Sequence, residues 1–187
     1  MTCPVTLEQA AAITHRGGVV AYPTEAVWGL GCNPFDPAAV KRLLALKQRP
    51  QAKGVILIAA GIEQLLPWID LAVLADARRV EILASWPGPN TWALPCNLAV
   101  PEWLRGDHAT LAARVTAHPV AAALCRAAGG PLVSTSANLA GKPPPRTLAE
   151  LDPSILAGID GWLAGETGGL ERPTPIRDAR TGDVLRS

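Results

Sequence analysis

The chain has 187 residues, of which 49% are hydrophobic and 18% charged, and 17 Lys and Arg against 16 Asp and Glu leave a formal net charge of +1. This composition argues against intrinsic disorder and against a protein that coats nucleic acid through bulk positive charge, so any basic site must be local. The sequence shows neither a signal peptide nor an apolar run long enough to span a membrane, and its four cysteines form no C-x-x-C pair. We therefore expect a cytoplasmic protein with free thiols and no membrane contact.

Hydrophobic periodicity and turn residues predict helices and strands that alternate along the chain. The run Val55–Ala59 is continuously apolar, which is typical of a strand buried on both faces. Helices are expected at Leu7–His15, from Asp36-Pro37 to near Lys47, at Ile62–Ile69, at Leu71–Ser85 and at Val120–Ala128. Strands are expected at Val19–Tyr22, Val55–Ala59, Thr91–Pro95, Leu111–Val115, Leu132–Ser136 and Val184-Leu185.

No internal repeat or linker divides the chain, so residues 1–187 are expected to form a single α/β domain. Its core should be a twisted, mixed parallel and antiparallel sheet flanked by helices. The sequence contains no phosphate-binding P-loop, and Gly29-Leu30-Gly31 begins a dinucleotide fingerprint that fails at Pro34. The three histidines share no motif, and no carboxylate cage for a metal ion is evident.

The segment Lys41–Lys53 contains five cations and no acid in thirteen residues of an otherwise balanced chain. Lys41 and Arg42 fit an ordinary solvated helix face. Lys47, Arg49 and Lys53 lie where the helix ends and the chain becomes extended. They can stabilise the negative end of the helix dipole, or they can converge on a polyanion such as a triphosphate, and spacing alone leaves both readings open.

Polar residues also follow two predicted strands. Ser134 and Ser136 alternate on Leu132–Ser136, and Asn138 follows in a turn, where hydroxyl, amide and backbone N–H groups could hold an anion. The alternative for Asn138 is an Asx turn that serves only the backbone. Thr24 follows the strand Val19–Tyr22, where it could cap a short turn or contact a substrate.

Arg114 interrupts the apolar alternation of the strand Leu111–Val115. Leu111, Ala113 and Val115 share one face, so the Arg114 side chain should project from the opposite face, beside the small Ala112. A guanidinium in this position can pair with a nearby acid to stabilise the sheet. It can equally bind the carboxylate of an amino-acid substrate.

Five stretches together resemble the YrdC-type threonylcarbamoyl-AMP synthases in order and spacing, over about residues 17–186. They are AYPTEAVWGLG, LKQRPQAKGVILIAA, WPGPNTWALP, LAARVTAHP and PLVSTSANLAGKPPPRT, and the most specific parts are Lys47-Gln48-Arg49 and Ser136-Ala137-Asn138. The resemblance implies a concave domain around a large, positively charged cavity. It also implies that L-threonine, bicarbonate and ATP are converted to threonylcarbamoyl-AMP and pyrophosphate. Partner proteins would then transfer the threonylcarbamoyl group to a tRNA adenosine next to the anticodon, making t6A.

The same resemblance implies two groups of site residues, with Lys47 and Arg49 as the catalytic pair. The threonine subsite would use Thr24, Lys53, Arg114, Ser134 and Thr174, and the nucleotide subsite would use Lys47, Arg49, Thr110, Ser136, Asn138 and Arg186. Pro173-Thr174-Pro175 departs from the more usual Pro-Ser element, although the hydroxyl is kept. Mg²⁺ is expected to be held mainly by ATP phosphates and water, with no protein metal site.

The implied chemistry suits these residue types. A carbamate formed from threonine is already an anionic oxygen nucleophile, so its attack on phosphorus requires no strong general base. Phosphoryl transfer instead needs positioning and charge neutralisation, which Lys and Arg supply.

Two other functions are open to the same sequence. A noncatalytic RNA-binding module could use the basic loop, but the small net charge predicts only weak tRNA contact. A carbamoyl-adenylate-forming enzyme of the hydrogenase-maturation type would carry zinc-binding cysteine pairs, which this sequence lacks.

Overall fold

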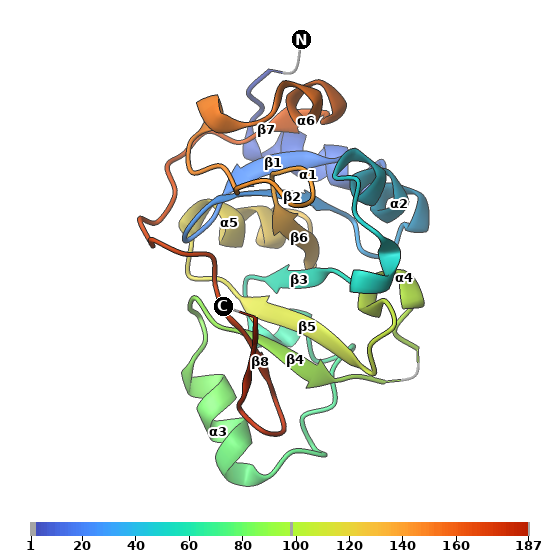
Figure 1. Cartoon of the computed structure of the whole chain (residues 1–187), viewed down its shortest axis with the longest axis vertical. Helices are drawn as coiled ribbons and strands as arrows, with labels where there is room; N and C mark the ends of the chain where they lie inside the picture. The colour runs from blue at the N-terminus through green and yellow to red at the C-terminus, as the bar shows by residue number, and fades with distance from the viewer. Residues whose placement is uncertain (1–2, 98, 187) are drawn as a thin grey trace.

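The computed structural model describes residues 3–97 and 99–186. Within these residues the strands are β1 (Val20–Pro23), β2 (Trp28–Cys32), β3 (Ile56–Ala59), β4 (Thr91–Pro95), β5 (Thr110–Val115), β6 (Leu132–Ser136), β7 (Gly161–Trp162), β8 (Ile176–Asp178) and β9 (Val184–Arg186). They form one nine-stranded sheet in the order β7-β1-β2-β6-β3-β5-β4-β8-β9 (Figure 1). β6 pairs antiparallel with both β2 and β3, whereas β3 and β5 are parallel, so the predicted mixed sheet is confirmed.

The helices in the described ranges are α1 (Leu7–His15), α2 (Pro37–Leu46), α3 (Asp76–Ala84), α4 (Glu102–Arg105), α5 (Pro119–Ala127) and α6 (Pro153–Gly158), with single 3₁₀ turns η1 (Gln51–Lys53), η2 (Ile62–Gln64) and η3 (Leu148–Glu150). The predicted start of α2 is confirmed, because the Asp36 carboxylate accepts hydrogen bonds from the N–H groups of Ala38 and Ala39, with Pro37 in the first turn. None of these helices is long and apolar enough to cross a membrane.

Of the two helices predicted between residues 62 and 85, the first is wrong and the second begins later than predicted. Only η2 and α3 form there, and the chain between them is irregular. This connection folds against the edge of β4, where the Asp70 N–H donates to the carbonyl of Pro95, and it buries Ile69 and Leu74 in the core. The apolar spacing before α3 therefore belongs to an irregular connection with only a few buried residues, and Pro67 disfavours a continuous helix through it.

The strand β2 was not predicted. Gly29 and Gly31 occupy alternate positions in it, so its sequence shows little of the branched side-chain pattern that marks a strand. Packing requires glycine at position 31, because a Cβ atom there would lie 2.7 Å from the Tyr22 ring. The glycines therefore allow the neighbouring strand and the polar side chains beyond it to approach closely.

Helices cover the two faces of the sheet unequally. On one face, α1 and α5 pack over Val20, Tyr22, Ile58 and Leu132. On the other face, α2 and α4 join a larger core. The first face also carries polar residues further along the same strands, and α1 and α5 do not reach them. This uncovered stretch is where the cavity described next is formed. Trp92 is buried in the core, and the four cysteines are free thiols, as expected.

Candidate active site

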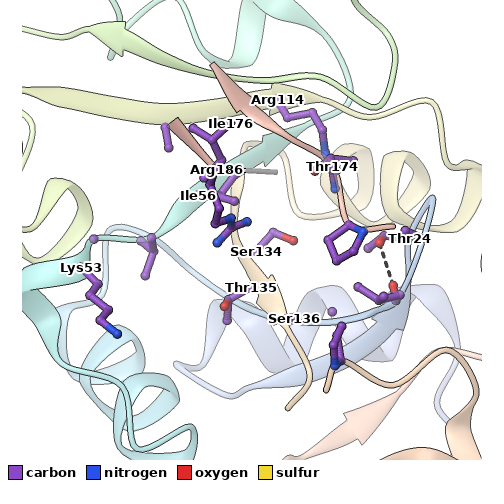
Figure 2. A pocket seen from close by; sticks show the side chains of 18 of the residues that line it. Thr24, Lys53, Ile56, Arg114, Ser134, Thr135, Ser136, Thr174, Ile176 and Arg186 are labelled. Carbon is purple, nitrogen blue, oxygen red and sulfur yellow. Dashed lines mark hydrogen bonds between the residues drawn. The ribbon is translucent and has the colours of Figure 1, made fainter. Parts of the chain in front are cut away.

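A cavity of about 320 Å³ opens on the uncovered part of the sheet. Its floor consists of residues that are neighbours across three central strands: Ile56 is paired with Ala112 on β5 and with Ser134 on β6. Figure 2 shows Ser134, Arg186 and Thr174 around the hollow, with Thr24 at one side and Lys53 at the other. We call this space the Arg114 lobe, because the Arg114 side chain forms its innermost charged wall.

A second cavity of about 370 Å³ adjoins the first. The two share the side chains of Arg49, Lys53 and Arg186, so they are two lobes of one cleft. This second space, the Thr110 lobe, is lined on its other sides by Arg105, His108, Thr110 and several apolar residues, namely Val55, Ala93, Ile176 and Leu185.

The structure brings most of the predicted site residues together. The five residues predicted for threonine all line the Arg114 lobe: Thr24, Lys53, Arg114, Ser134 and Thr174. Of those predicted for the nucleotide, Ser136 lines the Arg114 lobe, Thr110 lines the Thr110 lobe, and Arg49 and Arg186 line both. Lys47 lines neither lobe, and Asn138 lines a separate surface pocket beside Pro143–Pro145.

Arg49 is positioned by the way in which α2 ends. Gln48 adopts a positive φ of 52°, and the N–H of Arg49 donates to the carbonyl of Leu44 at 2.9 Å, which is a Schellman-type reversal. The reversal turns the Arg49 side chain into the cleft. There its Nη2 donates to the carbonyl of Gly54 at 3.0 Å. Burial and the neighbouring Arg186 lower the pKa of Arg49.

Lys47 is 3% exposed and lies behind the cleft. Its ammonium donates to the carbonyl oxygen of Asn138 at 2.6 Å and to that of Ser136. Burial, followed by the nearby Arg49 and Arg186, lowers the pKa of Lys47 to about 8. The side-chain nitrogen of Asn138 donates to the carbonyls of Leu139 and Lys142, which differs from an Asx turn, in which the side-chain oxygen accepts from a backbone N–H. Lys47 and Asn138 therefore fix the backbone that follows Ser136.

The surroundings of Arg114 fit both readings that its sequence position left open. It lines the cavity, yet it is only 6% exposed, and its Nη2 lies 3.3 Å from Oε2 of Glu25. Its Nη1 donates to the hydroxyl of Thr174 at 2.7 Å. Sequence analysis did not select Glu25 as a site residue. The only indication in the sequence was a single carboxylate within the otherwise uncharged segment Ala21–Leu30.

Thr24 does not cap a helical turn. Its N–H and its hydroxyl both donate to the carbonyl of Val27, at 3.1 and 2.7 Å, and so close the turn between β1 and β2. The closed turn carries Thr24 into the wall of the Arg114 lobe (Figure 2).

The site residues fit anions better than metal ions. Arg49, Lys53, Arg114 and Arg186 line the Arg114 lobe, and no Asp or Glu among the described residues lines either lobe. Within the same ranges, no three His, Cys, Asp or Glu side chains are grouped as a metal site.

Residues 12–187 match the Sua5/YciO/YrdC family, which is described as "Telomere recombination". The chain is 61% identical to the threonylcarbamoyl-AMP synthase of Xanthomonas campestris pv. campestris strain B100 over 180 residues, 96% of each chain. It is 58% identical to the threonylcarbamoyl-AMP synthase of Xanthomonas euvesicatoria pv. vesicatoria strain 85-10 over 186 residues, 100% of each chain.

Solved structures of the same fold include two with related sequences. The crystal structure of P. abyssi Sua5 complexed with L-threonine superposes with a TM-score of 0.85 and 30% identity, over 95% of this chain and 53% of that chain. E. coli YciO superposes with a TM-score of 0.84 and 26% identity, over 100% of this chain and 93% of that one. The chain therefore belongs to the Sua5/YciO/YrdC family, in a short form that matches the Xanthomonas threonylcarbamoyl-AMP synthases over their whole length.

Proposed function

We infer that this protein is a threonylcarbamoyl-AMP synthase, a nucleotidyltransferase that joins L-threonine, bicarbonate and ATP for the t6A modification of tRNA. The observation that carries this conclusion is 58–61% identity to threonylcarbamoyl-AMP synthases over nearly all of both chains. The two-lobed cleft supports it, because an amino acid and a nucleotide need adjoining sites when they are to be joined.

Threonine is assigned to the Arg114 lobe. Arg114 supplies a planar guanidinium for the amino-acid carboxylate, and the hydroxyls of Thr24, Ser134 and Thr174 offer hydrogen-bonding groups around it. Lys53, at the opposite side of the lobe, adds a mobile point charge. A related protein, P. abyssi Sua5, has been crystallised in complex with L-threonine, which supports threonine as a ligand of this fold.

The adenosine of ATP is assigned to the Thr110 lobe, whose apolar walls suit a base. Its phosphates would then extend toward Arg49, Lys53 and Arg186, which line both lobes and make their junction strongly cationic. This arrangement brings the α-phosphate next to the threonine amine.

The reaction then requires two bond-forming steps. Bicarbonate loses hydroxide to give carbon dioxide, to which the neutral amine of threonine adds. The proton that the amine then loses combines with that hydroxide as water, which leaves a carbamate. A carbamate oxygen attacks the α-phosphorus in line, the bond to the bridging oxygen breaks, and pyrophosphate leaves with its electrons. Arg49 and Arg186 line the cavity and would offset charge on the phosphoryl oxygens, so positioning and electrostatics would supply the catalysis.

Lys47 is assigned an indirect part in the nucleotide site. Since its ammonium binds the carbonyls of Ser136 and Asn138 without lining the cleft, it would hold the end of β6 against the phosphates. Mg²⁺ finds no carboxylate ligand among the described cleft residues, and ATP phosphates and water would hold it.

Partner proteins would complete the pathway. A mixed carbamic–phosphoric anhydride hydrolyses in water, so the product must be retained in the cleft and passed to a transferase that acts on tRNA adenosine. Contact of this protein itself with tRNA would be weak and sensitive to salt, in line with the net charge of +1.

The test is pyrophosphate release from ATP with threonine, bicarbonate and Mg²⁺ supplied together and omitted one at a time. Release should depend on threonine and on bicarbonate, and the adenylate should appear by mass spectrometry. Release that continues equally without threonine would contradict the synthase assignment, and no release at all would favour a noncatalytic RNA-binding module.

A further inference from the structure

We propose that Glu25, which lines neither lobe of the cleft, is a positioning residue that fixes the Arg114 guanidinium for the carboxylate of threonine. The proposal rests on the threonine assignment above and extends it to residues behind the cavity wall. It also assigns a part to Thr116, which orients the Glu25 carboxylate.

The Glu25 carboxylate is held from two sides. Its Oε1 accepts a hydrogen bond from the Thr116 hydroxyl at 2.7 Å and another from the N–H of Ala117 at 3.1 Å. Its Oε2 lies 3.3 Å from Nη2 of Arg114. Glu25 is 7% exposed, so solvent does little to screen this ion pair.

The backbone around Glu25 is tied to a third wall of the lobe. The N–H of Gly168 donates to the carbonyl of Thr24 at 2.9 Å, and the N–H of Leu170 donates to that of Glu25 at 3.1 Å. The segment thus fixed runs on to Thr174, whose hydroxyl accepts from Arg114. The turn at Glu25 therefore connects the Thr24 wall, the Arg114 wall and the Thr174 wall of one lobe.

This arrangement leaves Arg114 both oriented and available. Nη1 donates a hydrogen bond to Thr174, and Nη2 lies 3.3 Å from Glu25 as an ion pair without a hydrogen bond. Both terminal nitrogens therefore keep hydrogens for a ligand. In the empty cavity Glu25 neutralises a buried charge that would otherwise be costly to keep in place. A guanidinium fixed beforehand loses less conformational freedom when the substrate carboxylate binds.

Three variants test the proposal. Glu25→Gln keeps the shape but places an amide NH₂ opposite Nη2 of Arg114, and Thr116→Val removes the hydroxyl that holds Oε1. Each should raise the KM for threonine at least about tenfold, which corresponds to ~1.4 kcal/mol, and leave the KM for ATP within about twofold. Thr116→Ser restores the hydroxyl and should restore the wild-type KM for threonine.

A matched control separates positioning from stability. Thr14 is also a buried threonine with a hydrogen-bonded hydroxyl, but it lies on α1 and donates to Ala11 at 2.8 Å. Thr14→Val should lower Tm and leave both KM values unchanged.

Equal changes in the KM for threonine and for ATP, or no change in either, would overturn the proposal. If Glu25→Gln does not fold, the comparison of Thr116→Val with Thr116→Ser decides alone. These outcomes are distinct from a failure of the synthase assignment, in which the wild-type protein itself would not make pyrophosphate from the three substrates.

Discussion

Nη1 of Arg114 and Oγ1 of Thr174 are 2.7 Å apart, although the two residues are 60 positions apart in the chain. The hydrogen bond joins the strand β5 to the segment that precedes β8, and the Thr174 hydroxyl also lies 3.4 Å from that of Thr91. Thr174 is held between prolines and still provides a hydroxyl to the cavity. Threonine in place of the more usual serine therefore still provides the hydroxyl that accepts the hydrogen bond from Arg114.

Arg114→Ala should weaken threonine binding strongly and change ATP binding little when ATP is measured alone. Truncating one member of a buried charge pair typically costs about 2–4 kcal/mol, and here it also removes the proposed carboxylate ligand. Calorimetry with each substrate separately measures the two affinities. An equal loss for ATP would instead assign Arg114 to the nucleotide subsite, and loss of the folded state would indicate a mainly structural role for its pairing with Glu25.

Arg49→Lys should lower kcat/KM on the order of 10²-fold, because lysine cannot reproduce a planar two-nitrogen contact that also reaches the Gly54 carbonyl. The matched control is Arg42→Lys, the same substitution on the exposed side of α2, where Arg42 pairs with Asp160 at 2.7 Å. The control should keep wild-type kinetics. A folded Arg49→Lys variant within about threefold of wild type would show that Arg49 is an ordinary loop cation.

The pH dependence of the free energy of unfolding should reveal the lowered pKa of Lys47. Burial lowers its pKa from the usual 10.5 to about 8, so between these values the unfolded chain binds a proton that the folded protein has lost. The free energy of unfolding should therefore rise with pH through this window, by at most ~1.4 kcal/mol per pH unit from this one group. Denaturant titrations of wild type and Lys47→Met should differ in slope there, and parallel curves would contradict the lowered pKa.

Thiol labelling should divide the cysteines into two classes. Cys3 is exposed and Cys96 half-buried, whereas burial raises the pKa of Cys32 and that of Cys125 to about 12. A thiol reagent should label Cys3 and Cys96 in the native protein and all four after denaturation. An intramolecular disulfide found by mass analysis of the native protein would contradict this result.

Strand alternation made Arg114 predictable. The apolar residues Leu111, Ala113 and Val115 are buried, and the one charged residue among them projects from the other face into the cavity wall. The pattern could not distinguish an ion pair from a ligand site, because both place the same guanidinium on the same face. In the structure Arg114 has an acidic partner and also lines the cleft.

Glu25 and β2 were not predictable in the same way. The Glu25 carboxylate is paired with Arg114 and bonded to Thr116, 91 positions away, and local patterns carry no information about such partners. Gly29 and Gly31 have no side chains, so β2 lacks the alternating pattern by which a strand is recognised in a sequence. Between residues 62 and 75, the burial of Leu65, Ile69 and Leu74 in an irregular segment produced a spacing like that of a helix.

The position of β6 between β2 and β3 has a consequence for folding. Residues Trp28–Cys32 and Ile56–Ala59 both pair with Leu132–Ser136, so two apolar strand edges have no partner until that later segment has been synthesised. Unpaired edges favour association between chains, and long-range pairing slows folding. We expect nascent or truncated chains that lack Leu132–Ser136 to depend on chaperones and to aggregate when released. We also expect the two proposed subsites to form together, late in folding.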